Sequence, residues 1–224
     1  MTNISAGGVT LAYRALGAAD APPMVLLHGR CANRNDWNGI VRDLAATYRV
    51  YTLDLRGHGE SSRPGAYALP EMAEDVRAFL DALGIERAVV VGHSLGGMVA
   101  YHLAAAHPER VSALVMEDPP PPLPLTRPPL EEDTGDPNFD REMLVQTERQ
   151  FTAPDPAWAP GLQRITAPTL VVSGGATSHV PAPRTAELIP GARLVTIEAG
   201  HLVHFTQPAA FLAAVTDFLA ALPA

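Results

Sequence analysis

Ser94 is the residue whose setting points most directly to chemistry. Residues 89–97 read Val-Val-Val-Gly-His-Ser-Leu-Gly-Gly, and helix-compatible residues follow to Ala106. A Gly-x-Ser-x-Gly pattern between a buried strand and a helix predicts a sharp turn that exposes the serine hydroxyl. The glycines allow the strand and the helix to pass at close range. Ser94 is therefore a candidate nucleophile, at a helix N-terminus whose free N–H groups can bind an oxyanion.

Alternating strands and helices would position this turn. Buried-strand patterns occur at residues 24–27, 49–53, 89–91, 111–116, 169–172 and 193–197, and a first strand at 9–14 pairs with residues near Ile4. Amphipathic helix patterns occur near 33–44, 72–83 and 211–219, and further helices are expected after Ser94 to Ala106 and near 184–189. The alternation predicts an α/β fold, a mostly parallel twisted sheet with helices on both faces. We expect one domain over residues 1–224.

A proline-rich stretch interrupts this pattern. Residues 119–122 are four consecutive prolines, more prolines follow at 124 and 128–129, and residues 131–133 are acidic. One helix is expected near 141–151. We predict that residues 119–167 form a short lid over the carboxyl ends of the strands, where open α/β sheets bind ligands.

Composition excludes several classes of protein. The chain has 224 residues, 47% hydrophobic and 18% charged, with a net charge of −8 and a single cysteine. The negative charge argues against nucleic-acid binding, and no apolar run reaches the roughly 18 residues of a membrane span. The first eight residues do not resemble a signal peptide, so a cytoplasmic protein is expected. No metal or organic cofactor is implied, and the oligomeric state stays open.

Several motifs together resemble the α/β-hydrolase superfamily. They are His28-Gly29 after one strand, Asp54-x-Arg-Gly-His-Gly-x-Ser61 after the next, the serine turn, and Gly200-His201 after the last strand. The resemblance covers nearly the whole chain and implies a nucleophile, acid, histidine order. It makes His201 the base that takes the proton of Ser94. It also implies an oxyanion hole built from the backbone N–H groups of Arg30 and Leu95.

The resemblance implies a triad acid, but this chain does not carry one at the position where most members of the superfamily do. Residues 174–181 read Gly-Gly-Ala-Thr-Ser-His-Val-Pro, which places Thr177 at the usual aspartate position. In some relatives the acid follows the strand after the nucleophile helix. Here that strand ends in Glu117 and Asp118, and we favour Glu117 because it directly follows the apolar run. A serine–histidine dyad without an acid is also possible.

Other residues near these motifs have simpler interpretations. His204 is expected to be structural, Cys31 to pack, and Asp54 to brace its loop. The Arg30 side chain could approach an anionic substrate group or be solvated. His179 could line the pocket or cap a turn.

The expected function is hydrolysis of small carboxylic esters through an acyl-enzyme on Ser94. Dehalogenases and epoxide hydrolases of the resembling fold use an aspartate nucleophile, so a serine argues against both. One alternative is carbon–carbon bond hydrolysis, or acyl or perhydrolytic transfer, at the same serine. Another is a non-hydrolytic proton-transfer enzyme or a ligand-binding receptor. The only expected partner is a small-molecule substrate.

Overall fold

A computed structural model describes residues 2–130, 135–136 and 138–223. Within these residues, eight strands form one sheet in the order β1-β2-β4-β3-β5-β6-β7-β8. The strands are β1 (Thr2–Ala6), β2 (Val9–Leu16), β3 (Pro23–Leu27), β4 (Arg49–Leu53), β5 (Ala88–His93), β6 (Val111–Glu117), β7 (Thr169–Ser173) and β8 (Arg193–Thr196).

The strand directions match the predicted mostly parallel sheet. β1 and β2 form an antiparallel hairpin in which Ile4 lies opposite Leu11, and β2 pairs antiparallel with β4. All pairs from β4 through β3, β5, β6 and β7 to β8 are parallel. The carboxyl ends of these parallel strands therefore meet at one edge of the sheet.

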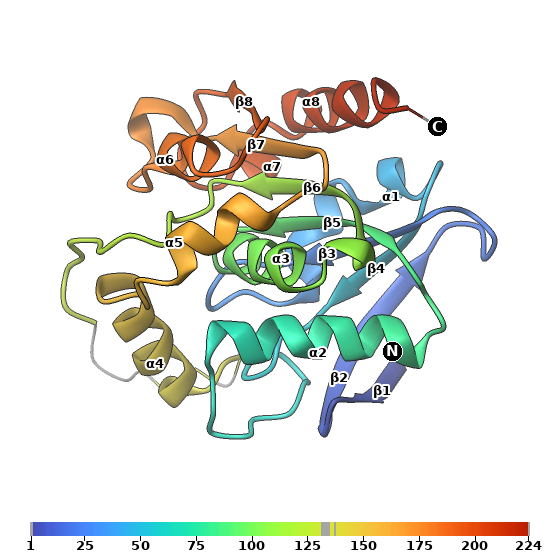
Figure 1. The fold of residues 1–224 in the computed structure, drawn as a ribbon. Coiled ribbons are helices and arrows are strands. Elements are labelled where there is room, and N and C mark those ends of the chain that lie inside the picture. Colours follow the sequence, from blue (N-terminus) through green and yellow to red (C-terminus); the bar gives the residue numbers. More distant parts are fainter. Residues whose placement is uncertain (1, 131–134, 137, 224) are drawn as a thin grey trace.

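Helices cover both faces of the sheet (Figure 1). The α-helices are α1 (Val41–Leu44), α2 (Leu69–Ala82), α3 (Leu95–Ala106), α4 (Arg141–Thr152), α5 (Trp158–Gly161), α6 (Ala182–Glu187), α7 (Val203–Thr206) and α8 (Pro208–Ala220). Short 3₁₀ helices are η1 (Arg34–Gly39), η2 (Pro108–Arg110), η3 (Leu162–Arg164) and η4 (Gly175–Thr177). Helices α2, α3 and α6 pack on one face, and α1, α7 and α8 pack on the other.

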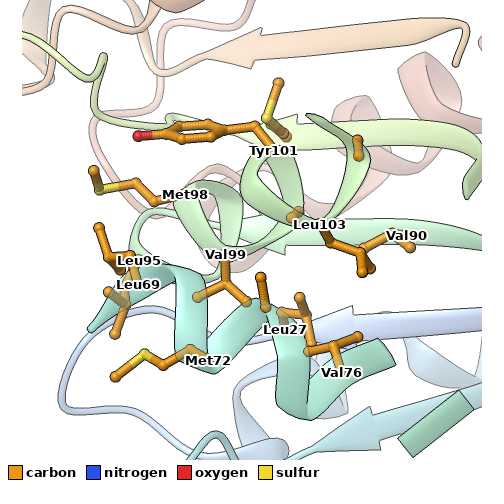
Figure 2. Close-up of a cluster of buried hydrophobic side chains, with 14 of the residues drawn as sticks. Leu27, Leu69, Met72, Val76, Val90, Leu95, Met98, Val99, Tyr101 and Leu103 are labelled. Atoms are coloured by element: carbon orange, nitrogen blue, oxygen red, sulfur yellow. The ribbon is translucent and has the colours of Figure 1, made fainter. Parts of the chain in front are cut away.

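Alternation along the central strands divides the core between these faces. In β3, Leu27 faces the α2–α3 side while its neighbour Leu26 faces the α8 side, because successive strand side chains point to opposite faces. Figure 2 shows Leu27 beside Val76 of α2, while Val90 lies near Leu103 of α3. Full burial of one such aliphatic side chain stabilises the fold by roughly 1.5–3 kcal/mol.

The helix expected over residues 33–44 is divided into two short helices. Asn33 caps η1 by accepting a hydrogen bond from the N–H of Asn35 at 3.0 Å. Ile40 then leaves helical geometry, with φ −127° and ψ −14°, before α1 begins at Val41. The apolar positions Trp37, Val41 and Leu44 are nevertheless buried, as the amphipathic spacing predicted.

The segment 119–167 departs from the strand–helix alternation. The helix predicted near 141–151 is α4, whose first turn is capped by Asp140 accepting from the N–H of Glu142 at 3.0 Å. Helix α4 lies beyond the ends toward which the arrows of β6 and β7 point (Figure 1). The acidic run at 131–133 lies outside the described residues. In the part of the chain that is described, no helix is long and apolar enough to cross a membrane.

Candidate active site

Ser94 occupies the turn between β5 and α3, and its backbone is held in an unusual conformation. Its φ is +50° and its ψ is −112°. A Cβ atom on Gly96 would lie 2.2 Å from the carbonyl oxygen of Leu27, and one on Gly92 would lie 2.3 Å from that of Gly96. Glycine is therefore required on both sides of the serine. A positive φ at a residue other than glycine costs of the order of 1–3 kcal/mol, and such strain often occurs at functional sites.

A line of hydrogen bonds runs from Ser94 through His201 to Asp118. The Ser94 Oγ atom lies 2.9 Å from His201 Nε2, and His201 Nδ1 lies 2.7 Å from Asp118 Oδ2. Because Nδ1–H donates to the carboxylate, Nε2 is left as an acceptor for the serine hydroxyl. Asp118 is fully buried and Ser94 nearly so, whereas the His201 side chain is 21% exposed.

The Asp118 carboxylate is fixed by two further donors. The N–H of Gly174 donates to Oδ1 at 2.9 Å, and the Ser178 hydroxyl donates to Oδ2. Asp118 itself has φ +45°, which turns the chain sharply after β6. The segment in which Thr177 replaces the usual acid thus supplies hydrogen-bond donors to a carboxylate from the neighbouring strand. Sequence reasoning missed Ser178, for which no pattern in the chain gave a signal.

Glu117, the acid that the sequence analysis favoured, does not contact His201, and this expectation is corrected. Its Oε2 atom lies 2.7 Å from His204 Nδ1, and its Oε1 accepts the backbone N–H of His204 at 2.9 Å. Glu117 is the last residue of β6 and continues the alternation of that strand, so it shares the α8 face with Val115. Asp118 follows the strand and is turned toward His201 by its positive φ.

His204 therefore belongs to a buried charged cluster beside the proposed triad. Asp36 Oδ1 lies 3.6 Å from His204 Nε2. Burial opposes a charge on His204, but the carboxylates of Asp36 and Glu117 outweigh it and raise the pKa of His204 to about 10. Burial also acts to raise the pKa of Asp36, yet His204 and His93 hold it well below its usual range. His204 is thus a buried cation, which agrees with the structural role expected for it.

His93, inside the serine motif, holds the loop that carries His201. Its Nε2–H donates to the backbone carbonyl of His201 at 2.9 Å. Its ring packs against those of both His201 and His204, with centroid distances of 4.8 and 5.3 Å. The motif residue next to Ser94 therefore fixes the approach of the histidine to that serine.

The two backbone amides that the sequence analysis expected to form an oxyanion hole, those of Leu95 and Arg30, lie in segments next to the cavity. Leu95 is the first residue of α3, so its N–H has no intrahelical acceptor. Arg30 lies in the loop after β3 and lines the same cavity as Ser94. Neither N–H donates a hydrogen bond to any described residue. Both amides are thus available to a ligand.

The cavity above Ser94 has a volume of about 440 Å³. The loop after β3 contributes Gly29, Arg30 and Cys31 to its wall, and segment 119–167 contributes Arg127 and Phe151. Segment 119–167 therefore forms part of the cavity wall. Burial raises the pKa of the Cys31 thiol, which keeps it protonated and agrees with a packing role.

The structure also shows the contacts of His179 and Asp54, which the sequence analysis expected in loops. His179 lines the cavity, with its ring centroid 4.5 Å from that of His201. The Asp54 carboxylate accepts the backbone N–H groups of Arg34 and Glu60 at 2.6 and 3.0 Å. Asp54 thus braces its loop, as expected.

A larger cavity, of about 670 Å³, lies between α2, α3 and α5. It contains the buried ion pair of Arg56 and Asp75 but neither Ser94 nor His201. We take the smaller cavity as the candidate site because it alone of the two contains the serine–histidine contact. Within the described ranges, no group of three or more His, Cys, Asp or Glu side chains is arranged to hold a metal ion.

Comparison with known proteins agrees with this geometry. A sequence model of the alpha/beta hydrolase fold matches residues 22–157, more than half of the chain. A solved structure titled as a hydrolase from Pseudomonas aeruginosa PA01 superposes with a TM-score of 0.81 at 32% identity, covering 98% of both chains.

Curated relatives match over shorter stretches. Epoxide hydrolase 4 of Mus musculus is 37% identical over 116 residues, which cover 50% of this chain and 32% of the relative. A pimeloyl-[acyl-carrier protein] methyl ester esterase of Aeromonas hydrophila is 47% identical over 96 residues, covering 42% of this chain and 36% of the relative. The match thus spans about a third of the length of these relatives.

Proposed function

Because this chain belongs to the alpha/beta hydrolase family, we propose that it is a serine hydrolase that cleaves small carboxylic esters through an acyl-enzyme on Ser94. The observation that carries the proposal is the continuous contact from Ser94 Oγ through His201 to Asp118. A serine hydroxyl is a weak nucleophile until a base takes its proton, and this arrangement supplies the base.

The first half of the reaction forms the acyl-enzyme. Ser94 Oγ attacks the ester carbonyl carbon while His201 Nε2 takes the hydroxyl proton. Asp118 holds the imidazole in the required tautomer and stabilises its cation. The N–H groups of Leu95 and Arg30 receive the negative charge that develops on the carbonyl oxygen. His201 then protonates the leaving alkoxide as the ester C–O bond breaks.

The second half returns the enzyme to its starting state. Water attacks the acyl-enzyme, and its proton goes to His201. The carboxylic acid leaves as His201 returns a proton to Ser94 Oγ. Each turnover thus consumes one ester and one water and releases one acid and one alcohol.

The position of Asp118 bears on the alternatives. The threonine at position 177 would favour a receptor or a proton-transfer enzyme if it left His201 without an acid. Asp118 offers a carboxylate to His201 from another strand, so that threonine does not argue against a hydrolase. Serine at position 94 favours ester cleavage over epoxide opening, for which resembling enzymes carry aspartate. Carbon–carbon bond hydrolysis and acyl transfer would use the same catalytic groups. Assays with the substrates of each reaction distinguish them from ester hydrolysis.

Steady-state hydrolysis of p-nitrophenyl acetate and butyrate by the wild type and by Ser94→Ala tests the proposal. We expect wild-type turnover and a loss of at least about 10³-fold in kcat in the variant, since the triad acts as a unit. Circular dichroism checks that both proteins are folded. Equal rates in the two folded proteins would overturn the proposal.

A further inference from the structure

Two arginines from distant parts of the chain meet in the wall of the Ser94 cavity. Arg30 comes from the loop after β3, and Arg127 comes from segment 119–167. Both line the cavity that contains Ser94 and His201. Both also line an adjoining cavity of about 370 Å³ that is lined by Glu148. The two arginines therefore line both cavities, the one that contains Ser94 and the one beside Glu148.

Both guanidinium groups are held by the same two residues of α4. Glu148 Oε2 lies 2.6 Å from Arg30 Nη1, and Glu148 Oε1 lies 2.9 Å from Arg127 Nε. The ring of Phe151 lies 5.0 Å from the guanidinium carbon of Arg30 and 5.4 Å from that of Arg127. Cation–π contacts of this kind and ion pairs both restrict side-chain rotation. The pair is thus ordered before any ligand arrives.

The charges of this cluster do not cancel. Two guanidinium cations share one carboxylate, and among the described residues neither has a second carboxylate within ion-pair distance. The side chains of Arg30 and Arg127 are only 15% and 17% exposed, so water screens the remaining positive charge incompletely. A guanidinium carries five N–H donors, and the contacts with Glu148 occupy few of them. Donors and net charge are both left for an anion.

The other ionisable groups around the cavity do not supply the missing negative charge. Asp36 also lines the cavity, but its carboxylate is paired with His204 and His93. Burial lowers the pKa of His179, and the positive charges of Arg127 and Arg30 act in the same direction. His179 is therefore neutral at pH 7.

We propose that the cavity is selective for esters that carry a carboxylate, which Arg30 and Arg127 bind while Ser94 attacks the ester carbonyl. This inference rests on the proposed ester hydrolysis and names the substrate class for it. Arg30 then has two parts in the site, since its backbone N–H faces the developing oxyanion and its side chain binds the remote anion. Guanidinium groups suit this task because they match a carboxylate with paired donors.

Matched pairs of esters test the selectivity. Methyl hydrogen glutarate is compared with methyl pentanoate, which places the carboxylate on the acyl side. 4-Acetoxybenzoate is compared with 4-methylphenyl acetate, which places it on the alcohol side. We expect kcat/KM to be about tenfold or more higher for the anionic member of at least one pair. The pair that shows the preference identifies the side that faces the arginines.

Variants of Arg30 and Arg127 then test whether these arginines cause the preference for anionic esters. Arg127→Gln should lower the anionic-to-neutral ratio of kcat/KM by about tenfold or more, and Arg30→Gln should act in the same direction. Arg127→Lys, which keeps the charge but not the fork of donors, should fall between the wild type and Arg127→Gln. Arg184→Gln is the control, because Arg184 is exposed on α6 and pairs with Glu187, and the ratio should not change. The preference should also weaken as salt is added.

The possible outcomes distinguish a failure of the proposed anion selectivity from a failure of the proposed ester hydrolysis. Hydrolysis of the neutral esters without any preference for the anions overturns the inference and leaves the serine hydrolase proposal intact. A preference that survives in both Arg127→Gln and Arg30→Gln also overturns it. Failure to hydrolyse any ester, with Ser94 unreactive toward a fluorophosphonate, overturns both. Circular dichroism of each variant excludes loss of the fold as the cause.

Discussion

Glu117 and His204 form a buried ion pair, with 2.7 Å between Glu117 Oε2 and His204 Nδ1, directly beside the contact between Asp118 and His201. The two pairs join the same segments, the end of β6 and the region around α7. One pair is fully enclosed, whereas the other reaches the cavity through His201. We infer that Glu117 and His204 anchor the segment from which His201 reaches Ser94.

Removing the charge of Glu117 should destabilise the protein. Glu117→Gln leaves the buried His204 cation with one fewer carboxylate, and breaking a buried ion pair costs about 3–5 kcal/mol. Urea denaturation would show this as a lower free energy of unfolding. The control is Glu187→Gln, whose ion pair with Arg184 is exposed and should contribute less than about 1 kcal/mol. Equal and small losses in both variants would contradict the anchoring role.

The raised pKa of His204 should make stability depend on pH. Folding raises that pKa from 6.5 to about 10, so the folded protein holds the proton more tightly than the unfolded chain. The resulting stabilisation is complete below pH 6.5 and disappears as pH rises toward 10. Urea denaturation should therefore show wild-type stability falling by a few kcal/mol across this range. The slope should be shallower in His204→Gln, and parallel profiles would contradict this assignment.

Substitutions of Asp118 and of Glu117 should have very different effects on kcat. Asp118→Asn should lower kcat on p-nitrophenyl butyrate by about 10³–10⁴-fold, because an amide cannot stabilise the imidazolium. Glu117→Gln leaves the contact between Asp118 and His201 in place, so kcat should fall by less than about tenfold. Rates are compared without urea, at a temperature at which both variants are folded. A large loss confined to Glu117→Gln would reverse the assignment.

The turn at Ser94 should not tolerate a side chain at Gly96. Gly96→Ala places a Cβ atom 2.2 Å from the Leu27 carbonyl oxygen, so β3 and α3 must separate. We expect a loss of about 2 kcal/mol or more in unfolding free energy and a large loss of esterase activity. Gly39→Ala is the matched control, because no atom lies within 4 Å of its added Cβ. Wild-type stability in Gly96→Ala would show that the close approach is not required.

Much of the fold and half of the site could be predicted from local patterns. The apolar runs of the central strands and the glycines around Ser94 each depend on neighbouring residues, and sequence displays such neighbours directly. His201 could be predicted because it follows the last strand. The break at Ile40 could not, because amphipathic spacing continues through it although the backbone leaves helical geometry there.

The remaining site residues depend on geometry that periodicity does not encode. Glu117 and Asp118 are adjacent carboxylates, and the positive φ of Asp118 decides which one meets His201. Ser178 reaches Asp118 from a segment 60 residues away. Arg127 and Glu148 come together across segment 119–167, whose proline-rich part has no regular spacing to interpret.

Trapping the acyl-enzyme would show whether Ser94 is the nucleophile. Wild-type protein and Ser94→Ala are mixed with p-nitrophenyl butyrate, quenched in acid during turnover, digested and analysed by mass spectrometry. We expect a butyryl group on the wild-type peptide that contains Ser94, and none on that peptide in the variant. Turnover without acylation of Ser94, or acylation at another side chain such as Cys31, would contradict this role of Ser94.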